Sequence, residues 1–292
     1  MKAPAFSYLR PESVSQAIDF IEFYGDDARL LAGGQSLLAA LNMRLAAPSV
    51  LIDLNGLPEL GGISVQGDKL VIGALTRHAE IECSPLVAQH APLLSLAMPH
   101  VAHAAIRNRG TIGGSIAFAD PAAELPACCV ALDAVFVVAG RGGERRVRAR
   151  DFFLGLYDTA LQTGEMLLAA EFSGVRTSER VAFRELARRH GDYAIAGLAA
   201  RATVNGNALR DVDFAFFAVD TKPVLATHAV AILEQGTVTP ERVQLAQQAL
   251  AQDLAPQDDV HYSSAMRMQL ARVLLARAVG DLLQPAGVQV SQ

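Results

Sequence analysis

The sequence predicts an α+β protein: a small parallel α/β unit, then an antiparallel section, then a three-stranded antiparallel sheet with a helical bundle. Three observations predict it. Residues 1–55 alternate strand and helix patterns around a glycine pair. Residues 56–176 carry hairpin signals, and residues 177–292 read as strands followed by helices. We expect the first two ranges to form one domain and the third to form another.

The N-terminal part begins with a helix over residues 13–24. Ser13 and Gln16 have the spacing of a capping box, apolar residues follow at helical intervals, and Gly25 ends the pattern. The short apolar run ARLL then stops at Gly33 and Gly34, SLLAALNMRL has helical character, and VLIDL reads as a strand. The order strand, glycine turn, helix, strand predicts a parallel α/β unit.

The middle part changes to short strands joined by turns. ISVQGDKLVIG and AVFVVAGRGGERRVRARDF each read as a hairpin. Residues 76–132 between them read as helices and loops. This pattern predicts an antiparallel sheet with a helical insertion.

The C-terminal part reads as three strands, VAFREL, LAARATVNGNALR and VDFAFFAV, with Asn205–Gly206 as a strong hairpin turn. A last helix is expected over residues 263–283. Its apolar face is predicted from five positions: Met266, Leu270, Val273, Leu274 and Leu282.

Composition excludes several classes of protein. The net charge of -5 and the pI of about 5.8, without a basic face, exclude a nucleic-acid partner. No apolar run reaches the roughly 18 residues of a membrane span, and the N-terminus lacks a signal-peptide core, so we expect a cytoplasmic protein. Three cysteines, Cys83, Cys128 and Cys129, cannot supply the four thiolates of an iron–sulfur cluster, and we expect buried, inert thiols and no metal site.

The first segment with chemical content is Ala32-Gly33-Gly34-Gln35-Ser36-Leu37, between a strand and a helix. Two glycines allow unusual backbone conformations and close approach of a ligand, so successive N–H groups can converge on an anion. The start of the helix adds the positive end of its dipole. The alternative for this segment alone is an ordinary tight turn.

The second segment, residues 107–115, repeats this chemistry with Gly110, Thr111, Gly113, Gly114 and Ser115. One such loop is weak evidence, but two suggest a clamp for a pyrophosphate. Glu124 follows and offers a carboxylate to sugar-like hydroxyls; its alternative is a solvated residue or a helix cap.

AGGQSLLA and TIGGSIAFADPAAELP together resemble the paired FAD-binding signatures of the medium subunits of molybdenum hydroxylases, the family of xanthine dehydrogenase and carbon monoxide dehydrogenase flavoproteins. The resemblance extends from FSYLRPES to ARRHGDYAIAG. It implies a PCMH-type FAD-binding domain followed by the C-terminal domain of carbon monoxide dehydrogenase flavoproteins.

The resemblance also implies roles for individual residues. It assigns the pyrophosphate to both glycine segments and an acidic ribityl contact to Glu124. Val101 and Leu168 are expected near the flavin, Arg184 stands where relatives often carry Lys, and Tyr193 matches an aromatic that gates access to the flavin ring. The predicted cofactor-binding residues are Ala32, Gly33, Gly34, Gln35, Ser36, Leu37, Val101, Gly110, Thr111, Gly113, Gly114, Ser115, Glu124, Leu168, Arg184 and Tyr193.

The implied function is electron transfer inside a larger oxidoreductase. Members of the family work with a small subunit that carries 2Fe-2S clusters and a large subunit that carries the molybdenum cofactor, as a dimer of heterotrimers. Electrons pass through FAD to an external acceptor such as NAD, oxygen, a quinone or a carrier protein. No catalytic residue beyond the flavin is expected on this chain.

Four other interpretations of the sequence compete with this one. GRGGER at residues 140–145 lacks the third glycine of a dinucleotide fingerprint and reads better as a hairpin turn. Gly113-Gly114-Ser115 misses the nucleophile elbow of a hydrolase, which would also need a histidine such as His100, His103 or His190. A flavin-free scaffold and a free-standing flavin oxidoreductase remain as alternatives. Gln35 replaces a histidine seen in some relatives, and the cysteines cannot fill the extra cluster loop of hydroxybenzoyl-CoA reductases.

Overall fold

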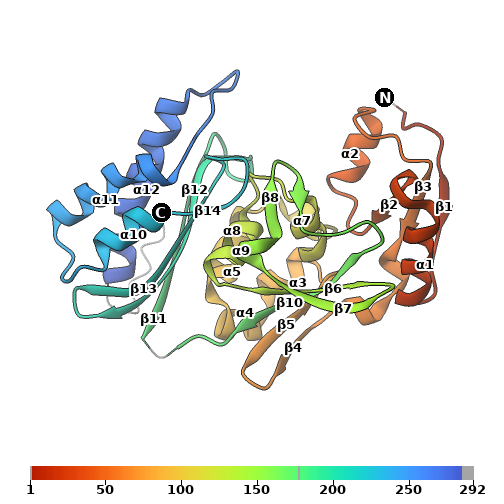
Figure 1. Ribbon diagram of the computed structural model, residues 1–292, viewed down its shortest axis with the longest axis horizontal. Coiled ribbons are helices and arrows are strands. Elements are labelled where there is room, and N and C mark those ends of the chain that lie inside the picture. The colour runs from red at the N-terminus through yellow and green to blue at the C-terminus, as the bar shows by residue number, and fades with distance from the viewer. Residues whose placement is uncertain (1, 177, 285–292) are drawn as a thin grey trace. The chain divides into compact units, whose positions relative to one another are not determined.

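The computed structural model describes residues 2–176 and 178–284 (Figure 1). The chain forms two compact units. The first comprises residues 1–91, 101–120 and 133–174, and the second comprises residues 92–100, 121–132 and 175–292. The expected α+β class, with parallel and antiparallel sheets, is confirmed. The domain boundaries drawn from the sequence stay predictions.

The first unit contains the predicted small parallel sheet. Its strand order is β1-β3-β2, and both pairings are parallel. The Ser13 hydroxyl accepts a hydrogen bond from the Gln16 N–H (3.2 Å), and Gly25 ends the first helix with a φ of 50°. The elements are β1 (Ser7–Leu9), α1 (Val14–Tyr24), η1 (Gly25–Asp27), β2 (Ala28–Leu31), α2 (Leu37–Asn42), β3 (Val50–Asp53), η2 (Leu54–Gly56) and η3 (Pro58–Leu60).

The same unit contains an antiparallel five-stranded sheet in the order β4-β5-β10-β6-β7. Both expected hairpins are present, and residues 140–145 contain the turn of the second one, at residues 141–142. The central strand was not predicted; it pairs with β5 and β6, and its register shifts between Leu167 and Ala169. The strands are β4 (Ile63–Gln66), β5 (Lys69–Gly73), β6 (Val135–Gly140), β7 (Gly143–Arg148) and β10 (Met166–Ser173).

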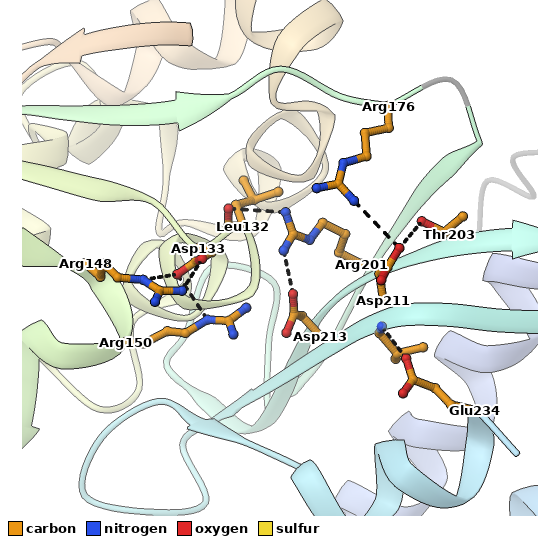
Figure 2. Close-up of polar contacts among 11 residues, drawn as sticks. Leu132, Asp133, Arg148, Arg150, Arg176, Arg201, Thr203, Asp211, Asp213 and Glu234 are labelled. Atoms are coloured by element: carbon orange, nitrogen blue, oxygen red, sulfur yellow. Dashed lines mark hydrogen bonds and ion pairs between the residues drawn. The ribbon is translucent and has the colours of Figure 1, made fainter. Parts of the chain in front are cut away.

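Short helices and one small hairpin complete the first unit. Asp133, which precedes β6, pairs with Arg148 (2.6 Å) and Arg150 (3.2 Å) and ties the start of β6 to the end of β7 (Figure 2). The remaining elements are α3 (His78–Cys83), α4 (Pro85–His90), α6 (Ala104–Arg107), α7 (Ile112–Phe118), α9 (Ala149–Phe152), β8 (Phe153–Gly155) and β9 (Asp158–Thr159).

The second unit is one antiparallel sheet in the order β11-β12-β13-β14, with helices. The Asn205–Gly206 turn joins β12 to β13 as predicted, so ALR belongs to the third strand; a two-residue fourth strand was not expected. The elements are α5 (Pro92–Ala97), η4 (Met98–His100), α8 (Glu124–Ala131), β11 (Glu179–Ala187), β12 (Ala194–Asn205), β13 (Ala208–Phe217), β14 (Val224–Leu225), α10 (Thr227–Leu233), α11 (Pro240–Asp253) and α12 (Ser264–Leu283).

This sheet is covered on both faces, because alternate residues of each strand point to opposite sides. Even-numbered residues of β12 and β13, such as Leu198 and Phe214, join the core formed with α10, α11 and α12. Odd-numbered Arg201 pairs with Asp213 (2.5 Å) and donates to the carbonyl of Leu132 (3.3 Å), at the end of α8 (Figure 2). The face with Arg201 is therefore the one that α8 covers, and this explains why every residue of α8 is buried.

Two expectations need correction. Met266 lies on the exposed side of α12, whereas Leu274 and Leu282 are buried as expected. Cys83 is exposed, because it lies at the end of the short helix α3, whereas Cys128 and Cys129 are buried. Among the described residues, no helix combines the length and apolar character that crossing a bilayer requires.

Gly197 fixes the packing of the second unit. It lies opposite Phe217 in the register of β12 and β13, and a Cβ at this position would come within 2.0 Å of the Phe217 ring. Phe217 stacks on Phe183 at 5.7 Å, so its ring has little room to move. We expect Gly197→Ala to lower the free energy of unfolding by about 2 kcal/mol, measured by urea denaturation. Gly280→Ala, in the last turn of α12 with open space around it, is the control and should raise the free energy of unfolding by roughly 0.5 kcal/mol.

Candidate functional site

The first glycine loop, residues 32–36, joins β2 to α2 and lies against the second loop. A Cβ on Gly33 would meet the carbonyl oxygen of Arg109 at 2.4 Å and the Cα of Gly110 at 2.8 Å. Gly34 has a φ of 73°, a conformation that residues with a side chain rarely adopt. Glycine is therefore needed at these positions for two different reasons: contact between backbones at Gly33 and a left-handed conformation at Gly34.

The first loop presents free backbone donors. Among the described residues, none accepts a hydrogen bond from the N–H groups of residues 33–37. The Gln35 side chain turns back and donates to the carbonyl of Gly33 (3.1 Å), so it does not cover them. Because the N–H groups of successive loop residues can converge on an anion, these five donors fit a ligand such as a pyrophosphate.

The second loop uses its N–H groups differently, and the expectation that it repeats the chemistry of the first is wrong in this respect. The N–H of Gly113 donates to Ala74 O (2.9 Å), that of Ile112 to Thr76 O (3.1 Å), and that of Gly114 to the hydroxyl of Thr111 (3.2 Å). Gly113 needs to be glycine because a Cβ would lie 2.5 Å from the Cβ of Ala74. Thr111, Gly113, Gly114 and Ser115 stay predicted cofactor contacts, with Gly113 and Gly114 offering close approach instead of N–H donors.

Gly114 of the second loop also lies close to the first loop. A Cβ there would lie 2.8 Å from the Thr111 hydroxyl and 3.9 Å from the Cβ of Ala32. Both α2 and α7 are short helices, so any anion bound here would depend on the loop N–H groups rather than on a long helix dipole. The clamp expected from two loops therefore corresponds to one contiguous structure in the first unit.

Leu168 is connected to this structure through the backbone. It is the residue at the register shift of β10, and its carbonyl accepts a hydrogen bond from Ala74 N (2.8 Å). The carbonyl of Ala74 in turn accepts from Gly113 N. Val101 is buried, and its carbonyl accepts from Arg107 (3.1 Å), which is also paired with Glu82 (2.7 Å). Both residues stay predicted flavin neighbours.

His78 lies beneath the second loop and was not found from the sequence. Its backbone N–H donates to Gly110 O (3.0 Å), and a Cβ on Gly110 would lie 2.9 Å from the ring atom Nδ1 of His78. Neither ring nitrogen has a hydrogen-bond partner among the described residues. Burial, with a smaller contribution from the charges of Arg107 and Arg77, lowers the pKa of His78 from 6.5 to about 4. The ring is therefore neutral at physiological pH.

In the second unit, Arg184 and Glu185 point to opposite faces of the sheet. The guanidinium of Arg184 makes two hydrogen bonds of 2.6 Å to Asp281 of α12, which holds it on the face covered by that helix. This ion pair raises the pKa of Arg184. Arg184 stays a predicted cofactor contact, although in this structure its guanidinium is bound to Asp281. Tyr193 is 69% exposed and lies just before β12.

Glu185 lies on the face where α8 begins with the buried Glu124. Its carboxyl oxygen is 3.9 Å from His100 Nδ1, and its side chain is 3% exposed. Burial, and then the charge of Glu124, raises the pKa of Glu185 to about 8. Glu185 is therefore protonated at neutral pH. Glu185 has no local signal in the sequence, because its burial depends on segments far away in the sequence.

This raised pKa predicts a pH effect on stability. The unfolded chain ionises Glu185 near its ordinary pKa of 4.5, whereas the folded protein ionises it only near 8. Its contribution to stability is thus present below about pH 4.5 and is lost as the pH rises to about 8. We expect Glu185→Gln to lose less stability than the wild type between pH 5 and pH 9 in urea titrations. Glu144→Gln, at an exposed position of β7, should follow the wild-type profile.

The hydrolase alternative finds no support in the geometry. Among the described residues, no histidine is hydrogen-bonded to the Ser115 hydroxyl. Instead, the free N–H groups and the close glycine contacts are features that suit an anionic ligand.

Comparisons with known proteins agree with this geometry. Residues 4–172 match the model of the FAD binding domain in molybdopterin dehydrogenase, and residues 181–282 match that of the CO dehydrogenase flavoprotein C-terminal domain. The chain is 37% identical to the 6-hydroxypseudooxynicotine dehydrogenase complex subunit alpha of Paenarthrobacter nicotinovorans, over 98% of this chain and 97% of that protein.

Solved structures show the same similarity. A chain of carbon monoxide dehydrogenase from Hydrogenophaga pseudoflava superposes with a TM-score of 0.93 at 37% identity, covering 96% of this chain and 98% of that one. A chain of quinoline 2-oxidoreductase from Pseudomonas putida 86 gives a TM-score of 0.90 at 37% identity, covering 97% and 100%. The chain therefore belongs to the family of FAD-binding medium subunits of molybdenum hydroxylases, which are components of oxidoreductases.

Proposed function

We propose that this chain is the electron-transfer subunit of a heterotrimeric molybdenum hydroxylase. In this role it receives electrons from 2Fe-2S clusters of a small partner subunit and passes them to an external acceptor. The single observation that carries the proposal is the row of free N–H groups over residues 33–37, packed against the second glycine loop in a chain of this family. Bound FAD would supply the ability to accept electrons singly and release them as a pair.

The residues of this chain would bind and orient the cofactor. We assign the pyrophosphate to Gly33, Gly34, Gln35, Ser36 and Leu37, whose N–H groups are free donors. The second loop would add close backbone contact at its glycines and the hydroxyls of Thr111 and Ser115. Glu124, Val101, Leu168, Arg184 and Tyr193 complete the proposed site as ribityl and flavin neighbours, with Tyr193 as a gate to the ring.

Partner subunits follow from the relatives. These are named as subunits or chains of enzymes acting on substrates as different as 6-hydroxypseudooxynicotine, carbon monoxide and quinoline. This chain is 37% identical to each of the three, so its sequence does not indicate which substrate the enzyme oxidises. We infer that the substrate is oxidised on a molybdenum-containing large subunit and that the assembly is a dimer of heterotrimers.

A cytoplasmic location fits the cysteines. All three are described, and none forms a disulfide, although Cys83 is exposed. Exposed free thiols are typical of reducing compartments.

The free N–H groups also bear on the flavin-free scaffold alternative. The row of N–H donors at residues 33–37 suits an anionic group, which favours a bound cofactor over that alternative.

The proposal can be tested with an affinity-tagged full-length chain purified from its native host. Iron–sulfur and molybdenum subunits should co-purify. Under anaerobic conditions, the chemically reduced iron–sulfur subunit should bleach the visible flavin band of the tagged chain. A flavin that stays oxidised after mixing with a reduced, co-purifying iron–sulfur subunit would contradict the electron-transfer role.

A further inference from the structure

A short polar chain connects the two glycine loops, and we call Asn55 and Arg77 together the brace. Asn55 lies in η2, directly after β3. Its Nδ2 donates to Ala32 O of the first loop (2.9 Å), and its Oδ1 accepts from Nη2 of Arg77 (2.6 Å). Nη1 of Arg77 donates to Arg109 O, at the start of the second loop (2.5 Å). The brace thus contacts each loop at a backbone carbonyl oxygen, Ala32 O in the first and Arg109 O in the second.

Asp53 holds Asn55 in place. The Oδ1 atom of Asp53 accepts from the backbone N–H of Asn55 (3.0 Å) and from its Nδ2 (2.5 Å), and the carboxylate also accepts from the hydroxyl of Tyr8. Asp53 is the last residue of β3, the central strand of the parallel sheet. The amide of Asn55 is therefore anchored to the sheet, which leaves it one orientation.

Arg77 is fixed through its backbone. It forms an isolated antiparallel bridge with Thr111, in which His78 N donates to Gly110 O (3.0 Å) and Ile112 N donates to Thr76 O (3.1 Å). A guanidinium has a rigid planar fork of donors, so fixing its stem also fixes where its two hydrogen bonds lie. The brace thus joins one element held by β3 to one held by the second loop.

The guanidinium of Arg77 has a further property. Its two hydrogen bonds go to a carbonyl and an amide oxygen, and no ion pair of Arg77 occurs in the described part of the chain. Its charge is therefore not neutralised by a direct carboxylate contact. Glu80 and Asp53 offset part of this positive charge at longer range, and the charge that remains lies between the loops, where it favours a pyrophosphate.

We propose that Asn55 and Arg77 are positioning residues that set the separation of the two loops and thereby the affinity for FAD. The inference rests on the proposed assignment of these loops to the pyrophosphate. The backbones of the two loops are in contact at Gly33 and Arg109. A small displacement of one loop therefore moves the N–H donors away from the phosphate oxygens that they would bind.

The test compares FAD binding to the full-length apoprotein by fluorescence titration. Arg77→Met and Asn55→Ala should each weaken binding by about tenfold, because the loop N–H groups move away from the oxygens they bind. Because both residues act in one chain of contacts, the double variant should bind FAD about as tightly as the single variant with the lower affinity. Arg77→Lys, which keeps the charge but not the fork, should recover part of the loss. Arg141→Met, which removes an arginine of the β6–β7 turn paired with Glu22, should bind FAD normally.

Melting temperatures of the apoproteins separate positioning from folding. We expect Asn55→Ala and Arg77→Met to melt near the wild type without FAD and below it with saturating FAD. If Arg77→Met fails to fold, Asn55→Ala alone decides. Wild-type affinity in both single variants, or fully additive losses, would overturn the brace; if Gly33→Val still loses FAD in that case, the loop assignment stands. Wild-type affinity in Gly33→Val as well would overturn the proposed site itself.

Discussion

Gly33→Val should produce a folded protein whose affinity for FAD is lower by on the order of a hundredfold or more, which corresponds to losing two or three charge-assisted hydrogen bonds. Any Cβ at this position meets the carbonyl oxygen of Arg109 at 2.4 Å, so the two glycine loops must separate. Separation displaces the free N–H groups of residues 33–37. The measurement is equilibrium titration of the apoprotein with FAD, followed by flavin fluorescence.

Gly142→Val is the matched control for this substitution. Gly142 lies in the β6–β7 turn of the same unit, and nothing lies within 4 Å of the Cβ it would gain. The control should bind FAD as the wild type does. A folded Gly33→Val protein with wild-type FAD content would show that the loop contact has no part in the site.

Acid should destabilise the first unit through His78. The unfolded chain binds a proton at the ordinary histidine pKa of 6.5, whereas the buried ring binds one only near its lowered pKa of about 4. The stability that this neutral ring contributes is present above about pH 6.5 and is lost as the pH falls toward 4. At the acid end, the loss amounts to about 3 kcal/mol of unfolding free energy, from a shift of about 2.5 units.

The measurement is a series of urea titrations from pH 7 to pH 4, comparing wild type with His78→Gln, which cannot titrate at this position. The difference in unfolding free energy between the two should shrink by about 3 kcal/mol toward pH 4. His103→Gln, at an exposed position of the same unit, should keep the wild-type pH profile. Parallel profiles for wild type and His78→Gln would refute the buried neutral imidazole. Because His78 supports Gly110, FAD should also be released more readily in acid.

Local signals predicted much of the fold because they act within a few residues. The Ser13 cap, the stop at Gly25 and the Asn205–Gly206 turn depend on neighbours in the sequence, and the structure confirms all three. Central strand β10 was missed. Both its partners lie far away in the sequence, and the register shift at Leu168 interrupts its pattern. Long-range pairing of this kind leaves no local signature.

The candidate site divides in the same way. Both glycine loops could be found from sequence, because glycine pairs beside helix starts are local patterns. The sequence does not show which N–H groups are free. Those of Ile112 and Gly113 donate to the carbonyls of residues 76 and 74, which are distant in the sequence. Asn55, Arg77, His78 and Glu185 are inconspicuous in the sequence. Their importance comes from neighbours that only the folded chain brings together.

The most direct test of the central claim, that the first unit binds FAD through its glycine loops, is an absorbance spectrum of the purified full-length chain. Chromatography of any cofactor released on denaturation should accompany it. If the loops bind FAD, the spectrum should show the bands of an oxidised flavin and denaturation should release FAD, or protein purified without FAD should take up added FAD. A colourless chain that takes up no added FAD, even when produced with its partner subunits, would contradict this claim.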